Sequence, residues 1–239
     1  MAHGICCPLF VWKEKGRVMK KAPRETRTPF DGLRFFSALT HGVGAWLASV
    51  GTAVLVVLAA LTGSRWHLAT SIVYGVCLIG LYTASTLYHA LPLGEKGRRV
   101  LRKLDHMMIY FLIAGTYTPI CLITLRGVWG WWLFGIIWFL AVAGSLVKLL
   151  WMAAPRWLSA GAYIAMGWLV IVAVIPLVKA METLPFVMLL VGGAFYTLGG
   201  IIYALKLFGR ERPKFGFHEW FHICVLLGSI SHYIMILLL

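Results

Sequence analysis

Seven apolar runs, each about as long as a membrane is thick, constrain the fold of this 239-residue chain more than any other feature. A helix needs about 20 mainly apolar residues to cross the hydrocarbon core of a bilayer. The seven runs span residues 40–61, 68–90, 104–125, 128–151, 158–178, 184–207 and 217–239. Strands of a membrane barrel alternate in polarity at every second residue, whereas these runs are continuously apolar. The sequence therefore predicts an all-α fold, a bundle of seven transmembrane helices with no room for a separate soluble domain.

The distribution of charged residues indicates how this bundle is oriented in the membrane. Only 13% of the residues are charged, against about 25% in soluble domains. Eight of the 22 lysines and arginines precede the first run, and five lie in the second loop and four in or beside the sixth, counting Lys206. The first, third and fifth loops hold one each, and the fourth, counting Lys148, holds two. Positive charge favours the cytoplasmic side, so we expect a cytoplasmic N-terminus and an external C-terminus. The net charge of +14 then indicates contact with anionic lipid headgroups and no nucleic-acid partner.

The organisation along the chain is simple. Residues 1–36 form a basic cytoplasmic tail, and residues 37–239 form the seven-helix membrane domain. Cys77, Cys121 and Cys224 lie within the runs, and no cysteine spacing is typical of a disulfide framework or a zinc finger. No cleavage site follows the apolar start of the chain, so we expect no signal peptide.

The last run begins with two histidines that share one face. His218 and His222 are four residues apart, which places both rings on the same side of a helix. An imidazole in hydrocarbon is costly unless it has a partner. His232 lies ten residues further, about 15 Å along the axis, and is expected to have a packing or deeper polar role. Glu219 lies off the shared face and is expected to be solvated or paired with a loop cation.

Spans two and three add further polar groups at the same depth. Ser85 and His89 are also four apart, on the last turns of the second span. A lone serine in a membrane helix usually hydrogen-bonds its own backbone, and a lone histidine here would reach toward the membrane interface. The two at helical spacing favour a functional site. Asp105 opens the third span, either as a first-turn carboxylate favoured by the helix dipole or as a site carboxylate. His106 points about 100° away from it, so we favour Asp105 for the site.

The predicted topology brings these groups together near the cytoplasmic face. His89, His218 and His222 would form a three-histidine zinc site with an open fourth position, which is typical of catalytic zinc. Asp105 would accept a proton from water or orient it. Ser85 would bind the water or the substrate, or support His89. His41, at the start of the first span, is either an interfacial side chain or a supporting partner of the same site.

Several short motifs carry a resemblance to a known family. They are Thr-His-Gly-Val-Gly at 40–44, Ala-Ser-Thr-Leu-Tyr-His at 84–89, Ala-Gly-Thr-Tyr-Thr-Pro at 114–119, and Tyr-Ile-Ala-Met-Gly-Trp at 163–168. Together with Asp105, His218 and His222 they resemble the progestin and adipoQ receptor (PAQR) family, and most closely its bacterial branch, the hemolysin III-like proteins. The resemblance covers residue 37 to the end. One stretch departs: family members usually carry an acidic residue and an asparagine just before the Thr-His-Gly, where this chain has residues 33–39.

The resemblance implies a multi-pass protein of the plasma (bacterial inner) membrane, with zinc on His89, His218 and His222 and with Ser85 and Asp105 nearby. It also implies kinship with membrane hydrolases such as alkaline ceramidases. Three functions follow as hypotheses: a zinc-dependent hydrolase of lipid amides or esters, a non-catalytic receptor-like or membrane-homeostasis protein with structural zinc, and a cytolytic, pore-forming hemolysin. Uniformly apolar spans without a polar stripe disfavour a wide pore. The expected partners are membrane lipids, including a lipid substrate; the sequence does not indicate an oligomeric state.

Overall fold

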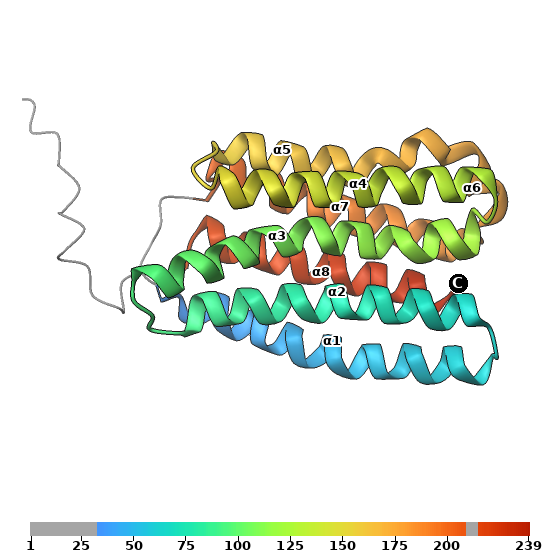
Figure 1. Ribbon diagram of the computed structural model, residues 1–239, viewed down its shortest axis with the longest axis horizontal. Coiled ribbons are helices and arrows are strands. Elements are labelled where there is room, and N and C mark those ends of the chain that lie inside the picture. The colour runs from blue at the N-terminus through green and yellow to red at the C-terminus, as the bar shows by residue number, and fades with distance from the viewer. Residues whose placement is uncertain (1–32, 209–214) are drawn as a thin grey trace, which may run out of the picture.

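The protein is an all-helical bundle whose long helices run side by side (Figure 1). The computed structural model describes residues 33–208 and 215–239. The helices are α1 (Phe35–Leu61), α2 (Arg65–Ala90), α3 (Glu95–Pro119) with the π-helical turn η2 (Ile120–Thr124), α4 (Val128–Leu150), α5 (Arg156–Gly167) with the 3₁₀ segment η3 (Trp168–Ala173) and α6 (Val174–Ala180), α7 (Thr183–Leu205) and α8 (Phe217–Leu237). Within the described ranges, seven helical stretches are long and apolar enough to cross a membrane. The chain is thus a multi-pass integral membrane protein, as predicted.

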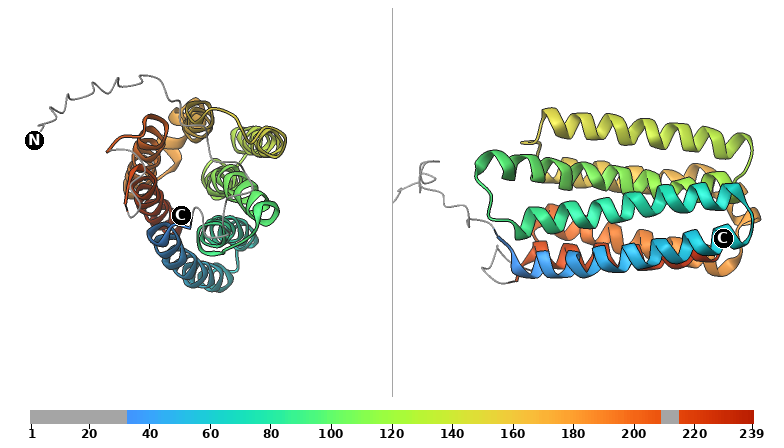
Figure 2. Two further views of the ribbon diagram at one scale, coloured as in Figure 1. Left: turned by 90° about the vertical axis from the view of Figure 1, so that its left-hand side faces the viewer. Right: turned by 60° about the horizontal axis from the view of Figure 1, so that its bottom comes forward.

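The helices close into a ring. In backbone packing, α1 contacts α2 and α8, α2 contacts α3, α3 contacts α5, α5 contacts α7, and α7 contacts α8. Helix α4 packs on the outside of α3 (Figure 2). The first and last spans are therefore neighbours. The end of the bundle where α2 ends and α3 and α8 begin, hereafter the site end, holds the residues discussed below.

Close backbone approach between α1 and α2 depends on glycine. A Cβ added at Gly44 would lie 2.6 Å from the Tyr82 ring, nearer than two carbon atoms can approach. Small residues at such positions let membrane helices pack closely. The approach brings the start of α1 against the last turns of α2, where His89 lies.

Helix α3 begins earlier than the sequence indicated. Residues 95–103 were predicted as a loop, but they form the first turns of the helix, with Glu95 in the first turn. A carboxylate in the first turn stabilises a helix through its dipole, and Gly94 precedes it in an extended conformation. Asp105 consequently lies about three turns into α3. Its interpretation as a first-turn carboxylate is wrong, because the dipole effect fades within one turn.

The fifth span is the least regular. It passes from α5 into a 3₁₀ segment and then into α6, which contains Pro176. Proline has no backbone N–H and clashes with the carbonyl four residues before it, here that of Val172. The regular hydrogen bonding of the span is interrupted at that point, within the stretch Trp168–Ala173.

Candidate metal centre

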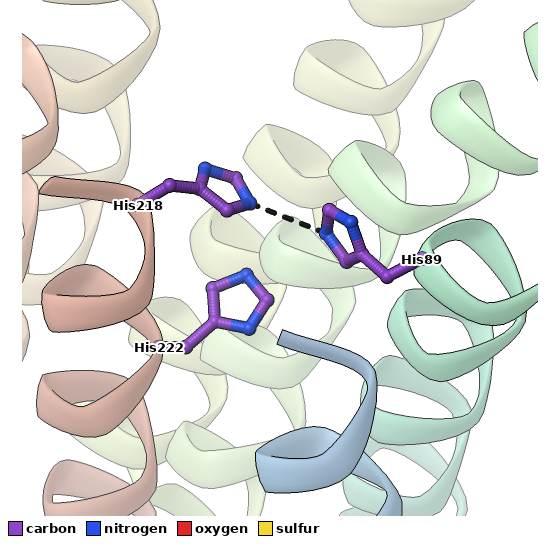
Figure 3. Close-up of side chains that lie close together, drawn as sticks. All are labelled: His89, His218 and His222. Atoms are coloured by element: carbon purple, nitrogen blue, oxygen red, sulfur yellow. Dashed lines mark hydrogen bonds between the residues drawn. The ribbon is translucent and has the colours of Figure 1, made fainter. Parts of the chain in front are cut away.

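Three histidines from two helices meet at the site end. His89 lies in the last turn of α2, and His218 and His222 lie in the first two turns of α8. Each ring offers one nitrogen such that the three nitrogens lie within 4.8 Å of one another. Figure 3 shows the rings facing one another across the gap between the two helices. Among the described residues, this is the group of histidine, cysteine and acidic side chains close enough to share a metal ion.

One pair of rings has the nitrogen spacing of two zinc ligands. His218 Nε2 lies 3.2 Å from His89 Nε2. Zinc–nitrogen bonds of 2.0–2.1 Å at tetrahedral angles place two ligand nitrogens about 3.3 Å apart. The Nδ1 atoms of His89 and His222 are buried without a hydrogen-bond partner among the described residues, and a metal held through Nε2 would not satisfy them. Without a metal, the close Nε2 pair would form one imidazole–imidazole hydrogen bond, in which only one ring donates.

A fourth histidine supports the cluster. His41 of α1 is buried and stacks on His222, with ring centroids 3.7 Å apart and an angle of 19° between the planes. It also makes a T-shaped contact with Tyr82. Both of its ring nitrogens lack a hydrogen-bond partner among the described residues. The sequence left His41 open between an interfacial and a supporting role; its contacts are those of a support that fixes the plane of the His222 ring.

Asp105 and Ser85 lie beside the histidines on the wall of one cavity. The cavity is also lined by His41, His218 and His222 and is otherwise mostly apolar. The Ser85 hydroxyl is buried without a hydrogen-bond partner among the described residues and lies near the Asp105 carboxylate. Asp105 is not part of the group of clustered ligand atoms, but it shares the cavity with two of them, His218 and His222.

His106 reaches the same cavity, which the sequence argument did not anticipate. Its Nδ1 donates to the Arg102 carbonyl oxygen at 2.9 Å and lies 3.5 Å from Asp105 Oδ2. Although the two side chains leave the helix in different directions, the cavity is wide enough at this level to be lined by both.

A buried ion pair fixes the two ligand-bearing helices relative to each other. Glu219, between the two histidines of α8, is buried and receives hydrogen bonds from Arg34 Nη1 at 2.9 Å and from Ser37 Oγ at 3.2 Å. Its other oxygen accepts the Gly216 N–H at 2.7 Å, which caps the start of α8. The Arg34 backbone N–H donates to the His89 carbonyl oxygen at 3.2 Å. Arg34 therefore bridges the last turn of α2 and the first turn of α8.

Sequence reasoning missed this bridge. The partner of Glu219 was expected in a loop, whereas Arg34 and Ser37 belong to the stretch 33–39 that departs from the family pattern. One signal was present. A glutamate three residues after a helix-capping position commonly reaches back to the backbone N–H of the cap, and Glu219 stands in that position after Gly216.

Seven membrane-spanning helices with a buried histidine cluster at one end of the bundle define a class of integral membrane protein. Comparison with known families places the chain within it: the family described as haemolysin-III related matches residues 34–233. The chain belongs to this family, which confirms the resemblance inferred from the motifs.

Individual relatives support the same family assignment. The chain is 37% identical over 203 residues to the Hemolysin-3 homolog of Bacillus subtilis (strain 168), covering 84% of this chain and 91% of the relative. It is 39% identical over 201 residues to Hemolysin-3 of Bacillus cereus, covering 84% and 89%. Human Monocyte to macrophage differentiation factor is 27% identical over 132 residues, 54% of each chain. This weaker similarity is consistent with the wider PAQR family.

Proposed function

We propose that the protein binds one zinc ion through His89, His218 and His222 and hydrolyses an amide or ester bond of a membrane lipid. The observation that carries the proposal is the convergence of three imidazoles beside a mostly apolar cavity that also holds Asp105 and Ser85. Three histidine ligands leave one position of a tetrahedral zinc open, as in catalytic sites. When bound there, zinc supplies a Lewis acid that polarises a carbonyl group and acidifies water.

The remaining roles fall to residues of the chain. Among the described residues, Asp105 is the one carboxylate on the cavity wall, and it accepts the proton of the attacking water as a general base. Ser85, on the same cavity wall, orients the Asp105 carboxylate or donates a hydrogen bond to the substrate carbonyl. His41 holds the plane of His222 by stacking. The apolar walls receive the hydrocarbon part of the substrate and exclude bulk water.

The location of the site follows from the charge distribution. Of the described loops and helix ends, the site end is rich in arginine and lysine, with five in residues 91–103. The positive-inside rule puts this end at the cytoplasmic face. We place the protein in the plasma membrane, with lipids of the inner leaflet closest to the cavity.

The test has two stages. Metal content per chain is measured by elemental mass spectrometry on protein purified without chelator, for wild type, His222→Ala and the control His67→Ala at the opposite end of α2. Wild type and His67→Ala should carry about one zinc, and His222→Ala should carry none. Lipid amides and esters are then offered in mixed micelles, with products followed by mass spectrometry. Metal-loaded wild type that releases no product from any of them would overturn the hydrolase proposal.

A non-catalytic role for the same metal is the alternative. Helix α8 packs mainly on α7 and α1, and α2 packs mainly on α1 and α3. A metal held by His89, His218 and His222 would thus link two helices that have little backbone contact, which is what a structural staple does. Asp105→Asn separates the two functions. Loss of turnover with zinc retained supports the enzyme, whereas an unchanged cellular phenotype with zinc retained supports the structural role.

A lytic activity, suggested by the name of the Bacillus cereus relative, has less physical support. The cavity is mostly apolar and lies within the helix ring, while a conducting path needs polar lining groups. The test is dye release from liposomes by the purified protein. Equal release by wild type and Asp105→Asn at the same protein-to-lipid ratio would favour lysis over hydrolysis.

A further inference from the structure

Three basic side chains line the site end of the cavity. Arg102 comes from α3, Lys148 from the last turn of α4 and Arg156 from the first turn of α5. Among the described residues that line the cavity, Asp105 is the one acidic side chain.

Lys148 is the least expected of the three. Its side chain is 3% exposed, and its ammonium donates to the Ser159 hydroxyl. Within the described ranges, neither Lys148 nor Arg102 forms an ion pair with a carboxylate. A buried cation without an anion is costly, because the neutral hydroxyl replaces only part of its hydration. The carbonyl groups at the end of α4 offset part of that cost, but they leave the charge unneutralised.

Arg156 is held in position by aromatic rings. Its guanidinium lies 5.8 Å from the centroid of the Tyr203 ring and 5.3 Å from that of Phe217. Such cation–π contacts restrict an arginine that would otherwise sample many rotamers. Phe217 directly precedes His218, so this cation stands next to the histidine cluster.

The polarity of the cavity changes in the same direction on two helices. On α3, Arg102, Asp105 and His106 are followed one turn deeper by Ile109. On α5, Arg156 and Ser159 are followed by Ala160 and Ile164, which also line the cavity. A cavity that is cationic at one end and apolar beyond it matches an amphiphile with an anionic head and a hydrocarbon tail.

We propose that Arg102, Lys148 and Arg156 form a subsite for the phosphate of a phosphate-bearing amphiphile whose hydrocarbon chain lies along the apolar wall. The donors favour phosphate over carboxylate. An ammonium and two guanidinium groups on three helices line the cavity, and a phosphate monoester offers them three acceptor oxygens and a charge of about −1.5 to −2 near neutral pH. The subsite concerns binding and holds whether or not the neighbouring site hydrolyses its ligand.

The probe is dioleoyl phosphatidic acid, compared with dioleoyl phosphatidylcholine, which has the same chains and a zwitterionic head. Binding to the full-length protein in detergent micelles is counted by native mass spectrometry. Phosphatidic acid should bind at least about tenfold more tightly, since a hydrogen bond to a charged group is worth that much. Equal binding of the two lipids would overturn the subsite.

Three variants localise the effect. Lys148→Gln should weaken phosphatidic acid binding about tenfold or more, and the more exposed Arg102→Gln about twofold to fivefold. Arg99→Gln removes the same charge from an exposed position of α3 outside the cavity, and should change binding less than twofold. If Lys148→Gln does not fold, the comparison of phosphatidic acid binding by Arg102→Gln and by Arg99→Gln still tests the subsite. Equal losses in those two would assign the affinity to surface attraction and overturn the proposal.

Two further measurements distinguish lipid phosphate from free phosphate, and the subsite from the histidine cluster. Inorganic phosphate that displaces the lipid and binds with similar affinity would keep the subsite and assign free phosphate as its ligand. Phosphatidic acid binding that persists in His222→Ala supports the subsite independently of zinc and turnover. Loss of phosphatidic acid binding in His222→Ala with the fold intact would overturn its independence and assign the lipid to the histidine cluster.

Discussion

The two ends of α8 use histidine in different ways. At the start of the helix, His218 and His222 face His89 of another helix, with nitrogens close enough to share a metal. Ten residues further, His232 is also buried, but its Nε2 lies 3.1 Å from the Leu189 carbonyl oxygen and its ring packs against Tyr196. Both histidine environments are largely buried. The difference is that one ring has a backbone partner from the neighbouring helix, whereas the others have mainly one another.

The comparison teaches where a metal cluster can form in such a bundle. Near the far end of α8, the neighbouring helix offers His232 one backbone carbonyl, and its Nδ1 is buried without a partner among the described residues. At a helix end, the last carbonyls and first N–H groups are free to accept capping groups such as Glu219. Side chains from several helices can then converge without competing with regular helical hydrogen bonds.

Removal of one histidine from each region gives the largest expected contrast. His222→Ala should reduce bound zinc from about one per chain to none, because two remaining imidazoles do not fill a stable zinc site. His232→Ala should keep the full zinc content. Elemental mass spectrometry on both variants, with folding checked by size-exclusion chromatography, measures the difference. Equal zinc loss in the two would show that the metal does not depend on the cluster at the start of α8.

The Arg34–Glu219 pair should matter next. Arg34→Ala removes the side-chain bond to Glu219 but keeps the backbone N–H bond to His89. Groups that orient metal ligands typically change metal affinity by about 10–100-fold when removed, and we expect a loss in that range. Arg34→Lys, which keeps the charge without the planar fork, should lie between wild type and Arg34→Ala. Competition with a zinc chelator provides the measurement; unchanged affinity in Arg34→Ala would mean that α1 does not position the site.

Gly192 and Gly193 offer a matched pair around His232. A Cβ at Gly192 would overlap the His232 ring, whereas a Cβ at Gly193 meets only Trp168 at 3.9 Å. Gly192→Ala should lower the free energy of unfolding by about 1–3 kcal/mol through overpacking. Gly193→Ala should be neutral or stabilising by up to about 1 kcal/mol, because alanine favours helix. Thermal unfolding in one detergent compares them. A more stable Gly192→Ala variant would contradict the packing described for His232.

The smallest expected effect concerns the hydroxyl pair beside His232. Tyr196 and Ser229 share a hydrogen bond of 2.8 Å. Tyr196→Phe should cost about 0.5–1.5 kcal/mol, the net value of one such bond, with no change in zinc content. Combining it with Ser229→Ala forms a double-mutant cycle that isolates the pair. Fully additive losses would show that the bond contributes nothing.

The sequence was sufficient to predict the seven spans, because length and hydropathy decide them. It also pointed to His89, His218 and His222, since four-residue spacing and alternating topology place them on facing helix ends. Their proximity in space is now described, while zinc and catalysis stay predictions. The start of α3 was predicted nine residues late. Apolarity begins at Leu104, but helix formation follows backbone hydrogen bonding and continues through the polar turns from Glu95.

Other features depended on contacts between distant segments. The stacking of His41 on His222 joins residues whose separation carries no sequence signal. The partner of Glu219 is 185 positions away in the chain, and the burial of Lys148 depends on how α4 meets α5. No periodicity encodes such pairings, because they follow from how the ring of helices closes.

The order of synthesis gives the cluster a further property. His89 and His218 are separated by 129 positions, which a ribosome takes roughly 6 to 26 s to add at 5–20 residues per second. During that interval the polar face of the second span is in the membrane without the histidines it will contact. The cluster is completed only when the final span has entered the bilayer and closed the ring against the first. A chain shortened before its last span retains only one of the three histidines. Any function that needs all three is therefore confined to molecules whose synthesis is complete.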